Sequence, residues 1–266
     1  MSVRLFPLLA TFALAGCSAP EEVAERSGTK GASAAASASA STTGRAVTVK
    51  EDTALYSYEF SYPAPVGAFP GLRARVEGGA AKAKLEMIAE AKEARADAKA
   101  NDYPFNPHGY GEVWQVVADL PGYLSLSNAF HTYTGGAHGM YGMQGLVWDK
   151  ANARGFAPAE LFQSPGYLGG TMGDTVCEAL NKEREQRRGE PVDASDEFFG
   201  GCPELDDATI LVGSSNGKTF DRISVWYGPY VAGSYAEGAY ELDFPLTSAM
   251  LGAVKPAYRA AFSARK

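Results

Sequence analysis

The sequence is poor in the residues that build most catalytic and metal centres, with three histidines and three cysteines among 266 residues. It also lacks an excess of positive charge, because 24 Lys and Arg residues stand against 31 Asp and Glu residues, a net charge of -7. A nucleic-acid surface needs basic residues that neutralise phosphates, so we expect no nucleic-acid partner. The hydrophobic content of 45% is nevertheless sufficient for a buried core.

The N-terminus has the pattern of a bacterial export signal. A single early cation, Arg4, precedes the apolar run 5–14, and small residues lead into Cys17. The run is too short to span a bilayer as a helix, and the small residues before the cysteine resemble a lipobox. This resemblance implies cleavage after residue 16 and attachment of lipid to the Cys17 sulfur. The alternative is a free buried thiol in an N-terminal helix.

Residues 17–46 are predicted to form a lipidated cysteine followed by a flexible tether. The stretch is rich in Ala, Ser, Gly and Thr and has few large apolar side chains that could offset the entropy of ordering it. Two or more acyl chains anchor a protein stably, so we expect a palmitate-bearing lipoprotein held to a membrane through Cys17. Ser18, in place of an acidic residue, favours the outer membrane, with the folded part facing the periplasm.

Removal of residues 1–16 leaves Cys177 and Cys202 as the two cysteines without a lipid. Export places them in an oxidising compartment, where such a pair is expected to form a disulfide bond. Two reduced thiols remain the alternative, because the sequence does not show that the sulfur atoms meet.

The folded part shows strands and helices in blocks without regular alternation. Residues 56–63 alternate as in a half-buried strand, and a charged, Ala-rich stretch at 72–101 predicts a surface helix weakened at Gly78–Gly79. Three further strands separated by Pro and Gly predict an antiparallel meander, at residues 112–120, 123–134 and 140–148. A short helical turn is expected at 158–162, an amphipathic helix at 168–188, and strands at 209–212, 219–227 and 239–244. This order favours an α+β fold with antiparallel sheets and packed helices.

Two patterns of catalytic type lack the surroundings that their chemistry needs. Residues 213–217 match G-x-S-x-G, but no histidine follows the serine and Asn216–Gly217 is typical of a two-residue hairpin turn. His131 and His138 have no further ligands at the spacing of a metal site. We therefore expect no catalytic residues, no metal and no cofactor.

Two segments carry a family resemblance. Residues 133–139 read YTGGAHG and resemble the signature of the extracytoplasmic domain of RsiV-type anti-sigma factors, which bind lysozyme, and of the accessory domain of PdaC-type peptidoglycan deacetylases. Residues 226–234, WYGPYVAGS, are similar to a later segment of that family. The resemblance covers about residues 48–262 and implies a small N-terminal subdomain at 47–125 and a larger C-terminal domain at 126–266.

The resemblance implies a binding module rather than the complete family proteins. From the residue pattern we expect neither the transmembrane and anti-sigma segments of RsiV-type proteins nor a deacetylase domain. We expect a non-enzymatic envelope lipoprotein that binds a lysozyme-like muramidase or cell-wall material; a peptidoglycan-active enzyme and a purely structural lipoprotein are the alternatives. A structural and a ligand-contacting role remain open for His138. The candidate ligand-binding residues are Tyr133, Gly135, Gly136, His138, Tyr141, Tyr227 and Tyr230.

Overall fold

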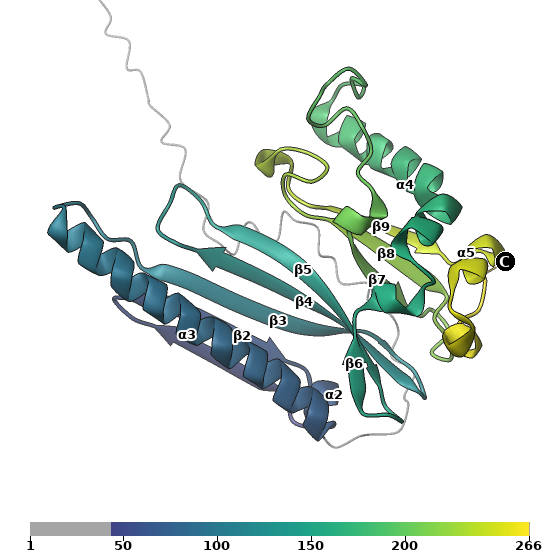
Figure 1. The fold of residues 1–266 in the computed structure, drawn as a ribbon, viewed down its shortest axis with the longest axis horizontal. Coiled ribbons are helices and arrows are strands. Elements are labelled where there is room, and N and C mark those ends of the chain that lie inside the picture. Colours follow the sequence, from purple (N-terminus) through teal and green to yellow (C-terminus); the bar gives the residue numbers. More distant parts are fainter. Residues whose placement is uncertain (1–43, 266) are drawn as a thin grey trace, which may run out of the picture. The chain divides into compact units, whose positions relative to one another are not determined.

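Six strands form the larger of two sheets in the computed structural model, which describes residues 44–265. They lie in the order β1-β2-β3-β4-β5-β6, so each strand neighbours the next one along the chain (Figure 1). Their bounds are Val47–Asp52, Tyr56–Tyr62, His108–Asp119, Tyr123–Tyr133, Met140–Asp149 and Arg154–Phe156. All pairs are antiparallel except β2 and β3, which run parallel.

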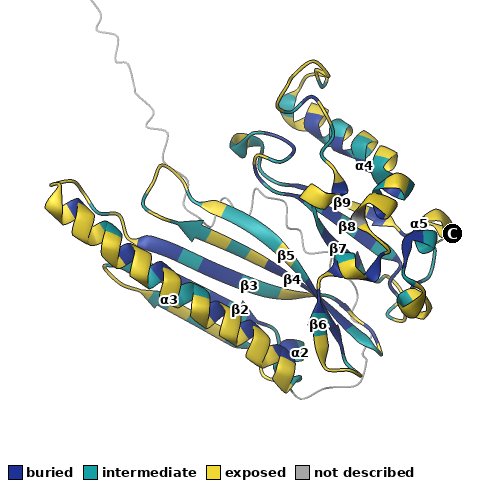
Figure 2. Ribbon diagram, in the orientation of Figure 1, coloured by how far each residue is buried: buried dark blue, intermediate teal, exposed yellow. Residues whose placement is uncertain are grey.

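The parallel pair requires a long connection, which helix α3 (Pro70–Ala100) supplies after the short helix α2 (Ala64–Gly67). Helix α3 lies along β2 and β3 and buries one stripe of side chains against them, while its outer side is exposed (Figure 2). Pro70 at its first position fits a helix start, because proline lacks the N–H that would otherwise stay unpaired there. The helix is continuous through Gly78 and Gly79.

Strands β7 (Thr209–Gly213), β8 (Arg222–Tyr227) and β9 (Tyr240–Pro245) form a second, antiparallel sheet. Helix α4 (Pro165–Arg188) packs on it, and the short helix α5 (Ser248–Ala253) packs on α4. The stripe predicted on α4 is confirmed, since four residues at four-residue spacing are 2% exposed or less: Leu168, Met172, Val176 and Leu180. Four short 3₁₀ turns complete the described elements, at Pro158–Leu161, Leu205–Asp207, Tyr235–Glu237 and Pro256–Ala261.

The α+β fold class and the antiparallel meander are confirmed. Helix α3 runs without a break through Gly78 and Gly79, which both lie on open helix surface. Two details at the start of β8 were wrong. Asn216–Gly217 lies in a longer connection between β7 and β8 rather than in a two-residue turn. Strand β8 begins at Arg222 and not at Thr219, directly after Asp221, whose carboxylate accepts hydrogen bonds from Ser215 N and Ser215 Oγ within this connection.

The remaining predictions about chain organisation concern the domain boundary, the signal peptide and the tether. The boundary proposed between residues 125 and 126 falls inside strand β4. The signal peptide, Cys17 and most of the tether lie outside the described residues. Within residues 44–265, no helix is long and apolar enough to cross a membrane.

The disulfide bond between Cys177 and Cys202 is confirmed, with Cα atoms 5.6 Å apart. It ties helix α4 to the end of the loop that follows it. The bond closes a segment with a sequence separation of 25. In the chain-entropy account such a loop is worth about 3.5 kcal/mol of stability.

Candidate functional site

The glycine-rich signature forms the connection between β4 and β5. Gly135 has a φ of +86°, a conformation that side-chain-bearing residues rarely adopt. The carbonyls of the turn are held from two sides, since Tyr133 Oη donates to Gly136 O at 2.9 Å and Asn106 Nδ2 donates to Gly135 O at 2.9 Å. A Cβ atom on Gly139 would lie 2.7 Å from Thr132 O. The turn therefore requires glycine at positions 135 and 139, whereas a Cβ atom on Gly136 would lie in open space.

The imidazole of His138 is held in a defined orientation although it is exposed. Its Nδ1 lies 2.9 Å from Gly139 O, which can only accept, so Nδ1 carries the proton. The Tyr230 hydroxyl lies 3.4 Å from Nε2 and donates to it in the neutral tautomer. The ring also stacks on Tyr235, with centroids 4.0 Å apart.

Tyr230 and Tyr235 come from the loop between β8 and β9. Tyr230 has a φ of +67° and is 51% exposed, so an aromatic side chain is presented from a sparsely populated backbone conformation. A hydrogen bond from Tyr230 N to Gly233 O, at 3.0 Å, stabilises this conformation. Strained residues of this kind concentrate at functional sites, which makes Tyr230 the first candidate for a ligand contact.

Tyr141, on strand β5, connects the glycine-rich turn to the β8–β9 loop. Its hydroxyl accepts a hydrogen bond from Ala239 N at 3.0 Å, and its ring contacts Tyr235 and Trp226 edge to face. Five aromatic rings from the glycine-rich turn, β5, β8 and the β8–β9 loop are thus joined by ring contacts. We call them the ring cluster: His138, Tyr141, Trp226, Tyr230 and Tyr235.

The structure brings only part of the predicted set together. His138, Tyr141 and Tyr230 belong to the ring cluster, and Tyr133 and the glycines support the turn. Tyr227 is separated from them: it is fully buried and its hydroxyl donates to Pro203 O at 3.2 Å. Alternation along β8 explains this, because neighbouring strand residues point to opposite faces. Sequence reasoning missed Tyr235 and Trp226, although both lie in or beside the segment that carried the resemblance.

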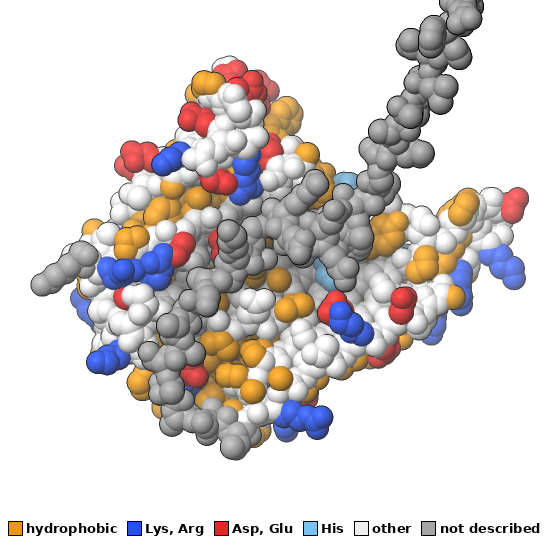
Figure 3. Space-filling view, turned by 180° about the vertical axis from the view of Figure 1, so that it is seen from behind, with side chains coloured by type: hydrophobic (Ala, Val, Ile, Leu, Met, Phe, Trp, Pro, Cys, Tyr) orange, Lys and Arg blue, Asp and Glu red, His pale blue; other side chains and the backbone are white. Residues whose placement is uncertain are grey.

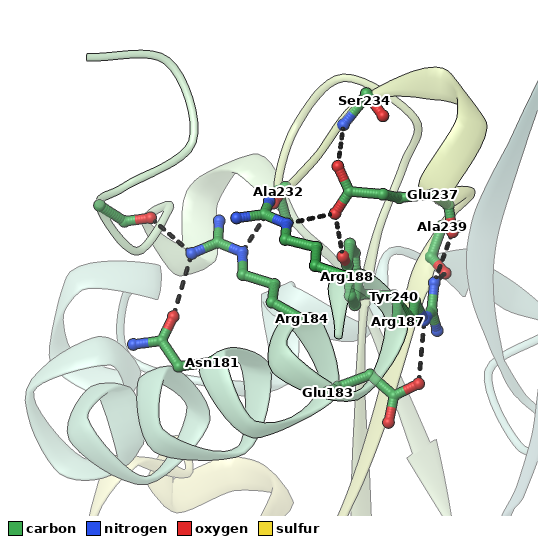
Figure 4. Close-up of polar contacts among 11 residues, drawn as sticks. Asn181, Glu183, Arg184, Arg187, Arg188, Ala232, Ser234, Glu237, Ala239 and Tyr240 are labelled. Carbon is green, nitrogen blue, oxygen red and sulfur yellow. Dashed lines mark hydrogen bonds and ion pairs between the residues drawn. The ribbon is translucent and has the colours of Figure 1, made fainter. Parts of the chain in front are cut away.

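Three arginines of helix α4 hold the β8–β9 loop from the other side (Figure 4). Arg184 Nε donates to Ala232 O at 2.7 Å, and Arg187 Nη1 donates to Glu237 O and Ala239 O, both at 2.8 Å. The Arg187 guanidinium also lies 4.1 Å from the centre of the Tyr240 ring. The loop that presents Tyr230 is therefore fixed along most of its length.

The carboxylate of Glu237 accepts hydrogen bonds from both helix α4 and the β8–β9 region. It accepts from Ser234 N at 2.9 Å, from Arg188 Nε at 2.8 Å and from Tyr240 Oη at 2.5 Å. Burial alone would raise the pKa of this carboxyl, but these hydrogen bonds outweigh burial and lower the pKa to about 2. Glu237 is thus ionised at any physiological pH.

The other sequence patterns do not form a reactive site in the part of the chain that is described. Ser215 Oγ donates to Asp221 Oδ2 at 2.6 Å, and Asn216 Oδ1 accepts from Lys218 N and Thr219 N. These contacts are those of a folded turn. Across residues 44–265, no group of three or more His, Cys, Asp or Glu side chains could hold a metal ion.

Comparison with known proteins finds a family model that matches part of the chain and two similar solved structures. No curated protein matches the chain significantly. Two solved structures are similar: a DUF3298 family member from Bacteroides fragilis (19% identity, TM-score 0.47, 76% of this chain and 91% of that chain) and a DUF3298 family protein from Pseudomonas aeruginosa PAO1 (16%, 0.48, 84% and 98%). Residues 49–141 match the family model described as Deacetylase PdaC, so the match includes His138 and Tyr141 and ends before the loop that carries Tyr230.

Proposed function

We propose that the chain is a non-enzymatic, lipid-anchored module of the bacterial cell envelope that binds a ligand in the periplasm through the ring cluster. The observation that carries this proposal is the exposed pair of His138 and Tyr230 on a rigid support. Aromatic side chains contribute large contact areas at low entropic cost, and a prearranged support lowers that cost further. Both sides of the support are fixed, by the glycine turn and by the arginines of α4.

The ligand that we favour is a cationic, lysozyme-like muramidase. The resemblance of residues 133–139 to RsiV-type proteins supports it, as does a mature charge of about -8, which would speed the encounter with a basic enzyme. Both acidic and basic side chains are present on the face seen in Figure 3, and the proposed attraction is argued from the net charge. Cell-wall material is the second ligand of the same proposal.

Titration calorimetry of the chain from Ser18 onward with lysozyme, at low salt, tests the proposal. We expect saturable binding that Tyr230→Ala weakens at least tenfold, since a central aromatic anchor often contributes 2 kcal/mol or more. Tyr167→Ala is the matched control, because Tyr167 is 50% exposed and lies on α4 outside the ring cluster. Absence of binding at about 100 μM would exclude the muramidase, and a pull-down with cell-wall fragments then tests the second ligand.

The alternative function is an enzyme that acts on peptidoglycan. The family model that matches residues 49–141 bears the name of a deacetylase and includes His138, which favours keeping this alternative. Product release from peptidoglycan that disappears in His138→Ala, while the circular dichroism spectrum is unchanged, would replace the binding proposal with the enzymatic one. A protein that neither binds nor reacts in these assays would be a structural lipoprotein.

A further inference from the structure

Two guanidinium nitrogens of the arginines on helix α4 have no hydrogen-bond partner among residues 44–265. They are Nη2 of Arg184 and Nη2 of Arg188, and both atoms are buried. The Arg184 side chain is among the most deeply buried in the described part of the chain, at 0% exposure. A buried donor without a partner costs free energy, and a buried cation costs more.

The remaining nitrogens of Arg184 bind neutral acceptors. Nε donates to Ala232 O at 2.7 Å, and Nη1 donates to Asn181 Oδ1 at 3.1 Å and to Gly201 O at 2.9 Å. These contacts satisfy hydrogen-bonding capacity but do not neutralise the charge. Arg184 is therefore a buried cation without a direct carboxylate partner among the described residues, an arrangement that proteins rarely keep.

Arg188 adds a second positive charge one helical turn later. Burial lowers the pKa of Arg184, and the charge of Arg188 lowers it further, so the two guanidinium groups repel each other. Figure 4 draws both guanidinium groups between helix α4 and the β8–β9 loop, and the charge of Arg188 acts on Arg184. The two residues therefore concentrate positive charge in a small volume.

The acidic groups that face this pair are already engaged. Glu237 Oε2 accepts from Arg188 Nε and Tyr240 Oη, and its Oε1 accepts from Ser234 N. Asp196, whose charge also acts on Arg188, accepts from Phe198 N at 2.9 Å in the loop that precedes Cys202. Of the two guanidinium groups, Arg188 is hydrogen-bonded to the Glu237 carboxylate, whereas Arg184 contacts no carboxylate among the described residues, and each group keeps a free Nη2 donor.

We propose that Arg184 and Arg188 bind one small inorganic anion, of the size of chloride or bromide, through their free Nη2 groups. A halide accepts hydrogen bonds from several donors and supplies the negative charge that a water molecule does not. Both nitrogens are enclosed, which favours a small spherical ion over a ligand that carries a carboxylate or phosphate on a larger body. The anion would neutralise Arg184, whose other nitrogens already join α4 to the β8–β9 loop at Ala232 O and to the loop before Cys202 at Gly201 O.

Thermal unfolding of the chain from Ser18 onward, at constant sodium concentration with chloride exchanged for gluconate, tests this site. We expect Tm to rise by about 3–5 °C for each tenfold increase of chloride above its dissociation constant, with bromide equivalent. Arg188→Gln should abolish the dependence even though it lowers Tm overall. Arg222→Gln removes the same charge from an exposed ion pair with Asp243 and should leave the dependence intact.

A crystal grown in bromide supplies the direct measurement. An anomalous difference peak within hydrogen-bonding distance of both Nη2 atoms supports the site. A water molecule at that position, or a chloride dependence that is equal in the wild type and Arg188→Gln, would overturn the proposal.

Discussion

The imidazole of His138 stacks on the ring of Tyr235 at a centroid distance of 4.0 Å and an interplanar angle of 28°. The same Tyr235 donates its hydroxyl hydrogen to Gly139 O at 2.8 Å, so one side chain contacts the turn through both its face and its polar end. The β4–β5 turn and the β8–β9 loop are thus docked on each other by specific contacts. This docking explains how a glycine-rich turn can hold a defined shape.

The first prediction concerns this docking. Tyr235→Phe removes only the hydrogen bond to Gly139 and should lower the free energy of unfolding by about 0.5–1.5 kcal/mol. Tyr235→Ala also removes the stacking and should cost about 0.5–1.5 kcal/mol more than its lost burial alone explains. Urea denaturation measures both values. Hydrogen exchange at residues 136–139 should accelerate in the alanine variant, and unchanged exchange there would contradict the docking.

A second prediction concerns the packing between the two sheets. A Cβ atom on Gly145 would lie 2.7 Å from Pro158 Cγ and 2.8 Å from Ile210 O, so Gly145→Ala should destabilise the protein by about 1–3 kcal/mol. Gly78→Ala is the control, because the position is helical and its surroundings are open. That variant should gain about 0.5–1 kcal/mol. Thermal or urea unfolding of the two variants should therefore move in opposite directions.

A third prediction concerns pH. The pKa of Glu237 is lowered from 4.5 to about 2 in the folded protein, so its contribution to stability is fully present above about pH 4.5. That contribution is lost as the pH falls from about 4.5 towards 2. Glu237→Gln should therefore destabilise the protein at pH 7 and differ little from the wild type near pH 2. A constant difference in unfolding free energy across this range would contradict the role assigned to Glu237.

A fourth prediction concerns the disulfide bond. Replacement of both Cys177 and Cys202 by serine should lower the free energy of unfolding by about 3.5 kcal/mol. Mass spectrometry of the wild-type chain under non-reducing conditions should find no free thiol at either position. Limited proteolysis of the serine variant should cut first in residues 190–201, the loop that the bond closes.

The fifth prediction concerns the anchor. Cys17→Ser removes the expected acceptor of lipid, so labelled palmitate should no longer enter the protein, and uncleaved or released precursor should accumulate. The wild-type chain, expressed in the same host, supplies the reference. Palmitate labelling that persists in the variant would show that the lipid is attached elsewhere.

Sequence patterns identified the elements whose burial is periodic. The stripe from Leu168 to Leu180 on α4, the three long strands of the meander and the cysteine pair were all predictable, because each depends on local spacing or simple pairing. Strand β1 was missed because none of its residues is fully buried and its second half is charged, and β6 was missed because it has only 3 residues.

The site was predictable only in part because its contacts join distant segments. The glycine turn and Tyr230 were found from local motifs, but nothing in the sequence places Tyr235 on His138 or brings three arginines of α4 to the β8–β9 loop. Tyr227 was selected with the same motif as Tyr230. Strand β8 ends at Tyr227, whose side chain is buried, whereas Tyr230 lies in the loop that follows and is exposed.

The parallel pairing of β2 with β3 sets the order in which the larger sheet can assemble. The β1–β2 hairpin and the β3–β4–β5 meander each need only local contacts, whereas Tyr56 meets His108 only after the whole of α3 has closed between them. Closing a connection of this length costs entropy before any contact repays it, which slows folding. From the topology of residues 47–149 we therefore expect two local units to form early and to join in one later step.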